Sequence, residues 1–426
     1  MHKIIGFEIV GELLFRPALD ALKISNYHRN CSGYSDADHL RVGIERVIQN
    51  ERSGRRWLLK CRLARGIGVS VRNFFKTLES GRRARMVLDV AEQVRLEADS
   101  RFGGTAHDEL AKHRELDGFS VYASDGHSHS SASHEKEIEG KIRAVTHIYS
   151  LNLRSHSMSH IALTTPAMGK KKEHEICTLK RIGGDALRMQ EPIGVKVIHA
   201  YDPAIVDYQQ WHRWKQGRGI YIITLQKSNC ALQLIENRSF EKDDPRNTGI
   251  LSDELIGNTK GVRLRRIRYQ DPETGKIYIY LTNEFTLPPG LLAFIYKLRW
   301  DVEKTFDQVK NLFEEKKAWA TSEESKIQQA AFITLAHNLT LMLEREIEQR
   351  EGIRDKKTEE RKAARIKTAT VAATAMGRTF NPLVAGVRRV TKRSVQFIGW
   401  LQVCLEHRTC WSDAMMQLRP LMEDYL

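Results

Sequence analysis

The sequence predicts an α/β protein with helical regions at both ends, and three observations support this fold class. Residues 1 to about 115 carry apolar side chains at helical spacing. Beyond residue 118 the apolar period changes to two, because Phe119 and Val121 alternate with Ser120 and Tyr122. The segment 327–347 then returns to the helical period and is long enough to be a core helix.

Strands and helices alternate in the middle of the chain. Strands are expected at 119–124, 147–153, 161–165, 195–199 and 220–225, and helices at 173–190 and 208–216. A β-rich stretch follows to about residue 287, with a hairpin whose arms are 262–269 and 276–282. One arm carries Arg263 and Arg265 and the other carries two tyrosines. This ribbon is compatible with a DNA contact and equally with a solvated hairpin.

The charge of the chain indicates a nucleic-acid partner. Lys and Arg total 68 against 53 Asp and Glu, which gives a net charge of +15. The excess is concentrated in residues 41–85 and 350–393, with 13 basic residues in each block against three and four acidic ones. Two basic blocks around a more balanced middle are typical of a DNA-binding protein, although a basic surface without a specific partner fits the same numbers.

The first basic block contains a candidate helix-turn-helix. The basic segment 69–78 follows Gly66 and Gly68, and a short helical segment precedes the two glycines. Many helical bundles contain such a turn, so a purely structural role is also open. The DNA-contacting residues expected in this region are Arg55, Arg56, Arg82 and Arg83.

Cysteine usage and hydropathy indicate the cellular compartment of the protein. The six cysteines are scattered without a Cys-x-x-Cys pair, which argues for a reducing compartment and against a structural zinc site. The apolar segment 4–15 is interrupted by Glu8 and Glu12 and lacks the features of a signal peptide. No uncharged run approaches the roughly 20 residues that a membrane span needs. We therefore expect a cytoplasmic protein with no membrane partner.

A helix over residues 291–310 is the most informative stretch, because two prolines and a glycine precede it. On a helical wheel, four functional side chains fall within roughly 60° of one another. They are Tyr296, Arg299, Glu303 and Lys310. Taken alone, Arg299 and Glu303 fit an ordinary surface ion pair. Beside an aromatic ring and a second cation, they also suit an anionic polymer that approaches a metal site.

Two aspartates complete a candidate metal site with this helix. Asp125 and Asp202 each end a predicted strand, where the sites of open α/β sheets collect. Together with Glu303 they form a set of hard oxygen ligands, which Mg²⁺ prefers. Either aspartate alone is equally well explained as a strand-end turn former. Three acids with the helix stripe favour phosphodiester chemistry with paired Mg²⁺ ions.

These residues give the chain a family likeness. It resembles the DDE transposases of bacterial insertion sequences, in the cut-and-paste branch called the insertion-sequence-four family. That family carries its third acid in a Tyr-x2-Arg-x3-Glu-x6-Lys signature, which this chain matches at Tyr296, Arg299, Glu303 and Lys310. Asp125 matches the first strand-end aspartate. Asp202 matches the second less closely because Pro203 follows it, which leaves Asp207 as a rival. The resemblance covers roughly residues 116 to 345.

The resemblance implies a ribonuclease-H-like catalytic core interrupted by a β-rich insertion. The expected regions are a helical DNA-binding domain (1–115), the first part of the core (116–225), the insertion (226–290), the second part of the core with the catalytic helix (291–348) and a basic helical C-terminal region (349–426). Asp125, Asp202 and Glu303 would hold two Mg²⁺ ions, with Mn²⁺ as a substitute. Tyr296, Arg299 and Lys310 would contact phosphates near the cut.

The implied activity is DNA cleavage and strand transfer at transposon ends. The implied partners are double-stranded DNA, as transposon ends and target, and a second copy of the chain in a synaptic complex. The implied location is the bacterial cytoplasm, in association with the nucleoid. Two alternatives remain open. One is a transposase-derived DNA-binding protein that is no longer catalytic, and the other is a metal-dependent hydrolase built on His127, His129 and His134.

Overall fold

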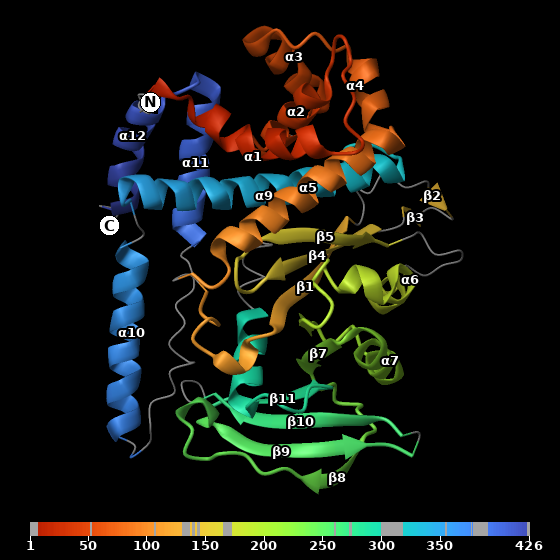
Figure 1. The fold of residues 1–426 in the computed structure, drawn as a ribbon, viewed down its shortest axis with the longest axis vertical. Helices are drawn as coiled ribbons and strands as arrows, with labels where there is room; N and C mark the ends of the chain where they lie inside the picture. Colours follow the sequence, from red (N-terminus) through yellow and green to blue (C-terminus); the bar gives the residue numbers. More distant parts are fainter. Residues whose placement is uncertain are drawn as a thin grey trace.

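The structure of this protein is a computed structural model, which is described here for most of the chain. The described residues are 7–51, 53–105, 108–129, 137–138, 141–142, 145–164, 173–259, 261–271, 275–299, 318–353, 356–375, 377 and 391–423. Among them the fold is mixed α/β, as the sequence predicts (Figure 1).

Five helices form the N-terminal part, which confirms the helical character expected for this region. They are α1 (Val10–Ile24), α2 (Asp36–Ile48), α3 (Gly54–Arg65), α4 (Val71–Leu78) and α5 (Gly81–Phe102). Each of the last four begins after a serine whose side chain accepts a hydrogen bond from the backbone N–H three residues later. These serines are Ser35, Ser53, Ser70 and Ser80. The helix boundaries of this region are therefore encoded locally.

A nine-stranded sheet forms the centre of the molecule, in the order β5-β4-β1-β6-β7-β11-β10-β9-β8. Its strands are β1 (Phe119–His129), β4 (Val145–Asn152), β5 (Met158–Leu163), β6 (Lys196–Tyr201), β7 (Ile220–Leu225), β8 (Gln233–Asn237), β9 (Ile250–Gly257), β10 (Arg263–Gln270) and β11 (Ile277–Thr282). β1, β6 and β7 run parallel to one another, and the other neighbours are antiparallel. A separate two-stranded ribbon joins β2 (Glu137–Ile138) and β3 (Lys141–Ile142).

One feature of the sheet differs from the sequence-based expectation, and a second shows how the β-rich stretch joins the sheet. β1 does not end at Asp125 but continues to His129, because β4 remains paired with it as far as Val145. The β-rich stretch after residue 226 does not stand apart from the α/β layer. β11 pairs with β7 from Tyr280↔Leu225 to Thr282↔Ile223, so β8–β11 extend the same sheet.

Helices cover both faces of the sheet (Figure 1). One face packs against α6 (Glu175–Leu187) and α7 (Tyr208–Arg218), which bury Leu179, Trp211 and Trp214 against β6, β7 and the β9–β11 strands. The other face shares a continuous core with the N-terminal helices, a helix at residues 289–299, and α9 (Glu323–Glu351). The chain continues into α10 (Lys356–Ala375), α11 (Thr391–His407) and α12 (Trp411–Glu423).

The long helix α9 also closes the edge of the sheet at β5. The Asn338 side chain accepts a hydrogen bond from the Met158 N–H at 2.8 Å and donates one to the Met158 C=O at 2.9 Å. Asn338 is fully buried, and it satisfies both backbone groups on the side of β5 that pairs with no other strand among the described residues. This contact joins segments that are 180 residues apart in the chain.

Candidate active site

Asp125 and Asp202 lie beside each other at the point where the parallel pairing of β1 with β6 ends. β1 and β6 are parallel neighbours, and the last pair of their register is Ser124↔Tyr201. Asp125 follows Ser124 within β1, and Asp202 follows Tyr201, the last residue of β6. Neighbouring strands are about 4.8 Å apart, so the two carboxylates are within reach of a shared ion. The structure thus brings together two acids that are 77 positions apart in the sequence.

The two aspartates are half-buried, and each is held by a local backbone hydrogen bond. One oxygen of Asp125 accepts from the N–H of Gly126 at 2.8 Å, and one oxygen of Asp202 accepts from the N–H of Ala204 at 2.7 Å. Gly126 is required here by space, since a Cβ at this position would stand 2.3 Å from an oxygen of Glu175. The strand around Asp125 is therefore packed tightly on the face opposite the carboxylate.

The alternation of side chains places both aspartates on the face that the 289–299 helix covers. Residues two apart on a strand share one face. The side chains that precede the two aspartates on this face belong to the same hydrophobic core as Ile295 and Tyr296 of that helix. These side chains are Val121 and Ala123 on β1, and Ile198 and Ala200 on β6.

The described part of the predicted catalytic helix ends at Arg299. Tyr296 and Arg299 are both buried, with only 1% and 3% of their surface exposed. The Arg299 guanidinium lies 5.3 Å from the centre of the Tyr296 ring, which suits a cation–π contact. Glu303 and Lys310, the other two members of the predicted set, lie outside the described residues.

The donor chemistry of this edge fits a divalent cation. Asp125 and Asp202 offer carboxylate oxygens from adjacent strands, the ligand type that Mg²⁺ and Mn²⁺ prefer. No group of three or more metal-ligating side chains is found within the part of the chain that the structure describes. The third predicted ligand, Glu303, falls outside that part.

Asp207, the rival for the second acid, has a structural role in the fold. Its side chain caps α7 by accepting from the N–H of Gln210 at 2.9 Å, and it forms an ion pair with Lys180. Partial burial would raise the pKa of Asp207, but the Lys180 ammonium and the Gln210 N–H outweigh it and lower the pKa below the usual value. These contacts account for Asp207 without a catalytic function.

The arginines expected to contact DNA have different surroundings. Arg55 and Arg56 on α3 and Arg263 on β10 are exposed. Arg82 and Arg83 both bind Asp36, with closest distances of 2.8 and 3.1 Å.

Arg265 is almost completely buried at 2% exposure and forms two hydrogen bonds with Asp253, at 2.7 and 2.9 Å. The acidic pair Asp253 and Glu254 inside the β-prone segment 250–257 was the sequence signal for an internal partner.

The histidine hypothesis finds no ligand set among the described residues. His127 lies on β1 opposite His147 of β4, and the Nδ1 of His147 is 3.2 Å from the Nε2 of His160. The side chain of His129 and all of His134 lie outside the described residues.

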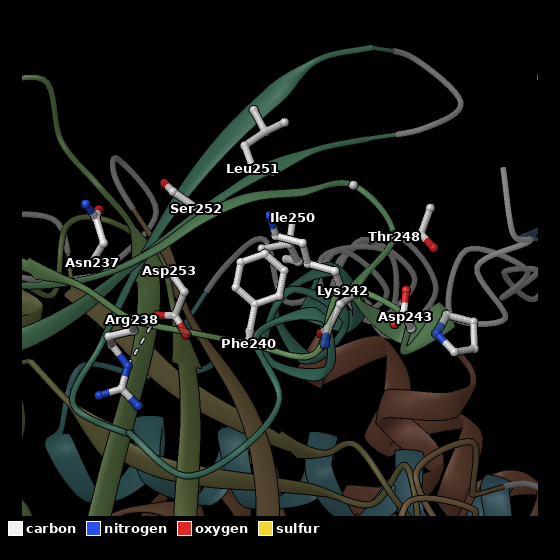
Figure 2. Close-up of a pocket in the computed structure, with 13 residues that line it drawn as sticks. Asn237, Arg238, Phe240, Lys242, Asp243, Thr248, Ile250, Leu251, Ser252 and Asp253 are labelled. Atoms are coloured by element: carbon white, nitrogen blue, oxygen red, sulfur yellow. Dashed lines mark ion pairs between the residues drawn. The ribbon is translucent and has the colours of Figure 1, made fainter.

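A pocket of about 770 Å³ opens between β8 and β9 (Figure 2). Phe240, Lys242 and Arg238 line it, and Arg238 faces Asp253 at 3.6 Å. Strands β7, β11 and β10 separate β9 from β6, which places the pocket roughly 20 Å across the sheet from Asp202.

Part of the chain is similar in sequence to a known protein family. Residues 205–339 match the family model of the transposase DDE domain. This span includes α7, the β7–β11 half of the sheet and the 289–299 helix, and it begins just after Asp202. No curated protein matches the chain. None of the described helices is long and apolar enough to cross a membrane. The family match supports a DDE transposase.

Proposed function

We propose that this chain is a metal-dependent DDE transposase of the insertion-sequence-four type, which cleaves DNA at the ends of its element and transfers the freed strand to target DNA. The observation that carries the proposal is the position of Asp125 and Asp202. They follow the same register pair on neighbouring parallel strands and lie on the sheet face that the helix of the matched span covers.

The strand order supports a ribonuclease-H-like core for this enzyme. β5, β4 and β1 form an antiparallel unit, and β6 and β7 are added to β1 in parallel. This mixed five-stranded arrangement places the carboxyl end of β6 beside Asp125, in the middle of β1. β8–β11 correspond to the expected insertion and extend the sheet beyond β7.

Asp125, Asp202 and Glu303 are the residues that would hold two Mg²⁺ ions, or Mn²⁺ in their place. The ions, when bound, supply activation of a water or 3′-hydroxyl nucleophile and neutralisation of charge on the phosphate. The chain itself orients the oxygens of the first two ligands, through the hydrogen bonds to the N–H groups of Gly126 and Ala204.

The cationic residues have two roles in this proposal. Arg55, Arg56 and Arg263 contact DNA phosphates from the surface. Arg299 acts from beneath the site with Tyr296, and Lys310 contributes a further phosphate contact. Arg82, Arg83 and Arg265 have a supporting role in this proposal, because their ion pairs with Asp36 and Asp253 hold α5 and β10 in place beside the DNA. Two copies of the chain assemble on paired ends, in the nucleoid of a bacterial cell.

The test is a nicking assay on a plasmid that carries the coding region with its native flanking DNA, in Mg²⁺ or Mn²⁺. Asp125→Asn, Asp202→Asn and Glu303→Gln should each abolish nicking and leave DNA binding intact, because each removes one negative ligand. Asp207→Asn is the matched control, since asparagine also caps a helix and nicking should persist. Normal nicking by Asp202→Asn together with loss in Asp207→Asn would reassign the second acid.

A further inference from the structure

The helix at 289–299 begins in close contact with the β8–β11 half of the sheet. The N–H of Gly290 donates to the side-chain oxygen of Asn247 at 2.9 Å. A Cβ on Gly290 would lie 1.9 Å from the backbone oxygen of Arg246, so only glycine allows this approach. The start of the helix is therefore fixed to the short helical turn Pro245–Asn247.

A second set of contacts joins the middle of the helix to the β10–β11 hairpin. The rings of Tyr296 and Tyr280 have centroids 5.1 Å apart at an interplanar angle of 48°. The next residue of the helix, Lys297, places its ammonium 3.8 Å from a carboxylate oxygen of Asp271, at the turn of the hairpin. Two consecutive helix residues thus contact an internal ring and a carboxylate at the turn.

The Tyr296–Tyr280 contact is part of a continuous series. Tyr278 stacks on Tyr280 with centroids 6.2 Å apart and an angle of 7°, and the Lys276 ammonium lies 5.1 Å from the Tyr278 ring. At the other end, Arg299 lies against Tyr296. The rings connect the half-buried Tyr278 on the hairpin to the buried arginine of the helix.

We propose that Tyr280 and Asp271 are positioning residues for the strand-cleavage reaction. Tyr280 acts through Tyr296, and Asp271 acts through Lys297. Together they fix the rotation and the axial position of the helix that carries Arg299 and whose sequence continues to Glu303. This inference rests on the proposed function, but its structural part can be measured without activity. In this proposal the β8–β11 region positions the 289–299 helix, in addition to extending the sheet.

The physical reason is that catalysis requires accurate placement. A tyrosine ring has few rotatable bonds and packs against its neighbour in a small number of arrangements. Replacing Tyr280 with leucine removes the ring contact while keeping an apolar side chain on β11. The helix would then lose its internal support near Tyr296, and a shift of about 1 Å in a ligand can lower a rate by about 100-fold.

The first experiment is hydrogen exchange of the whole protein, followed by mass spectrometry of peptides from 289–299. Tyr280→Leu should speed exchange in this helix by roughly two- to tenfold, the range that corresponds to the loss of one aromatic pair. Tyr280→Phe keeps the ring and should exchange like the wild type. Asn338→Leu, which weakens the opposite edge of the sheet, should leave exchange in 289–299 unchanged.

The second experiment measures the Mg²⁺ dependence of plasmid nicking, and DNA affinity in Ca²⁺. Tyr280→Leu and, to a smaller degree, Asp271→Asn should require more Mg²⁺ for half-maximal rate and nick at least about tenfold more slowly, with unchanged DNA affinity. Tyr280→Phe should restore both values, and Asn338→Leu should retain the wild-type Mg²⁺ midpoint.

The two experiments separate the possible failures. If wild-type protein does not nick DNA, the proposed function fails, and the exchange experiment still decides whether Tyr280 supports the helix. Unchanged exchange at 289–299 in Tyr280→Leu overturns the positioning role. An equal loss of activity in Tyr280→Phe also overturns it, because the hydroxyl rather than the ring would then be responsible.

Discussion

Asp36 is the residue whose substitution best tests how the N-terminal helices are held together. Its side chain is completely buried at the start of α2 and binds Arg82 through two hydrogen bonds of 2.8 Å. Arg83 lies 3.1 Å from the same carboxylate, and the Arg29 N–H donates to it at 3.0 Å. One buried carboxylate therefore pairs with two guanidinium groups on α5.

These contacts give the stability of the protein a defined pH dependence. Burial alone would raise the pKa of Asp36, but the hydrogen bonds and charges of Arg82, Arg83 and the Arg29 N–H lower it from 3.8 to about 2. Such a shift corresponds to about 2.5 kcal/mol of stability at pH 7. Because the folded-state pKa is the lower one, this contribution is complete above about pH 5 and is lost as the pH falls towards 2.

We predict that Asp36→Asn lowers the free energy of unfolding at pH 7 by about 3–5 kcal/mol, because the buried Arg83 and the half-buried Arg82 lose their counter-ion. Urea unfolding followed by circular dichroism measures this difference. At pH 3 the titration part of the difference should fall to about half of its value at pH 7. A variant as stable as the wild type at pH 7, or a difference that grows as the pH falls, would refute the argument.

Three further substitutions test other contacts. Asn338→Leu leaves two backbone groups of Met158 without partners in a buried position, so thermal unfolding should show a loss of about 2–4 kcal/mol; a smaller loss would mean that water replaces the amide. Gly290→Ala forces the helix away from Arg246, so a denaturant titration should show a loss of at least about 1–3 kcal/mol, and an unchanged midpoint would contradict the close contact. The double substitution Arg55→Gln and Arg56→Gln removes two exposed cations, so the slope of log binding constant against log salt concentration should become flatter by about two units. Replacing the buried, paired Arg265 as a control would instead unfold the hairpin region.

The arginines show why residue type alone does not identify a DNA-contacting surface. Arg55, Arg82 and Arg265 are equivalent as basic residues in basic segments. Arg55 is exposed, whereas the other two are bound to Asp36 and Asp253. Their partners are 46 and 12 residues away in the sequence, and pairing at such separations depends on helix packing and strand register. A count of charges therefore overstates the cationic surface that is available to DNA.

The sequence by itself determined the elements whose signals are local. The predicted strand at 220–225 has these bounds in the structure, because the apolar run sets its length. The hairpin around residues 271–275 was also expected, since a turn with Asp and Gly separates two β-prone arms. The types of residue at the candidate site, two aspartates and a Tyr-Arg helix, were visible in the same way.

Tertiary structure decided which of these residues meet. The pairing of β1 with β6 places Asp125 beside Asp202, and the pairing of β1 with β4 carries β1 past the predicted end to His129. The contacts of Tyr280 with Tyr296 and of Asn338 with Met158 had no sequence signal, because they join segments whose separation is fixed only when the sheet is assembled. Local pattern specifies secondary structure, whereas register and helix packing, which depend on the whole core, specify the site.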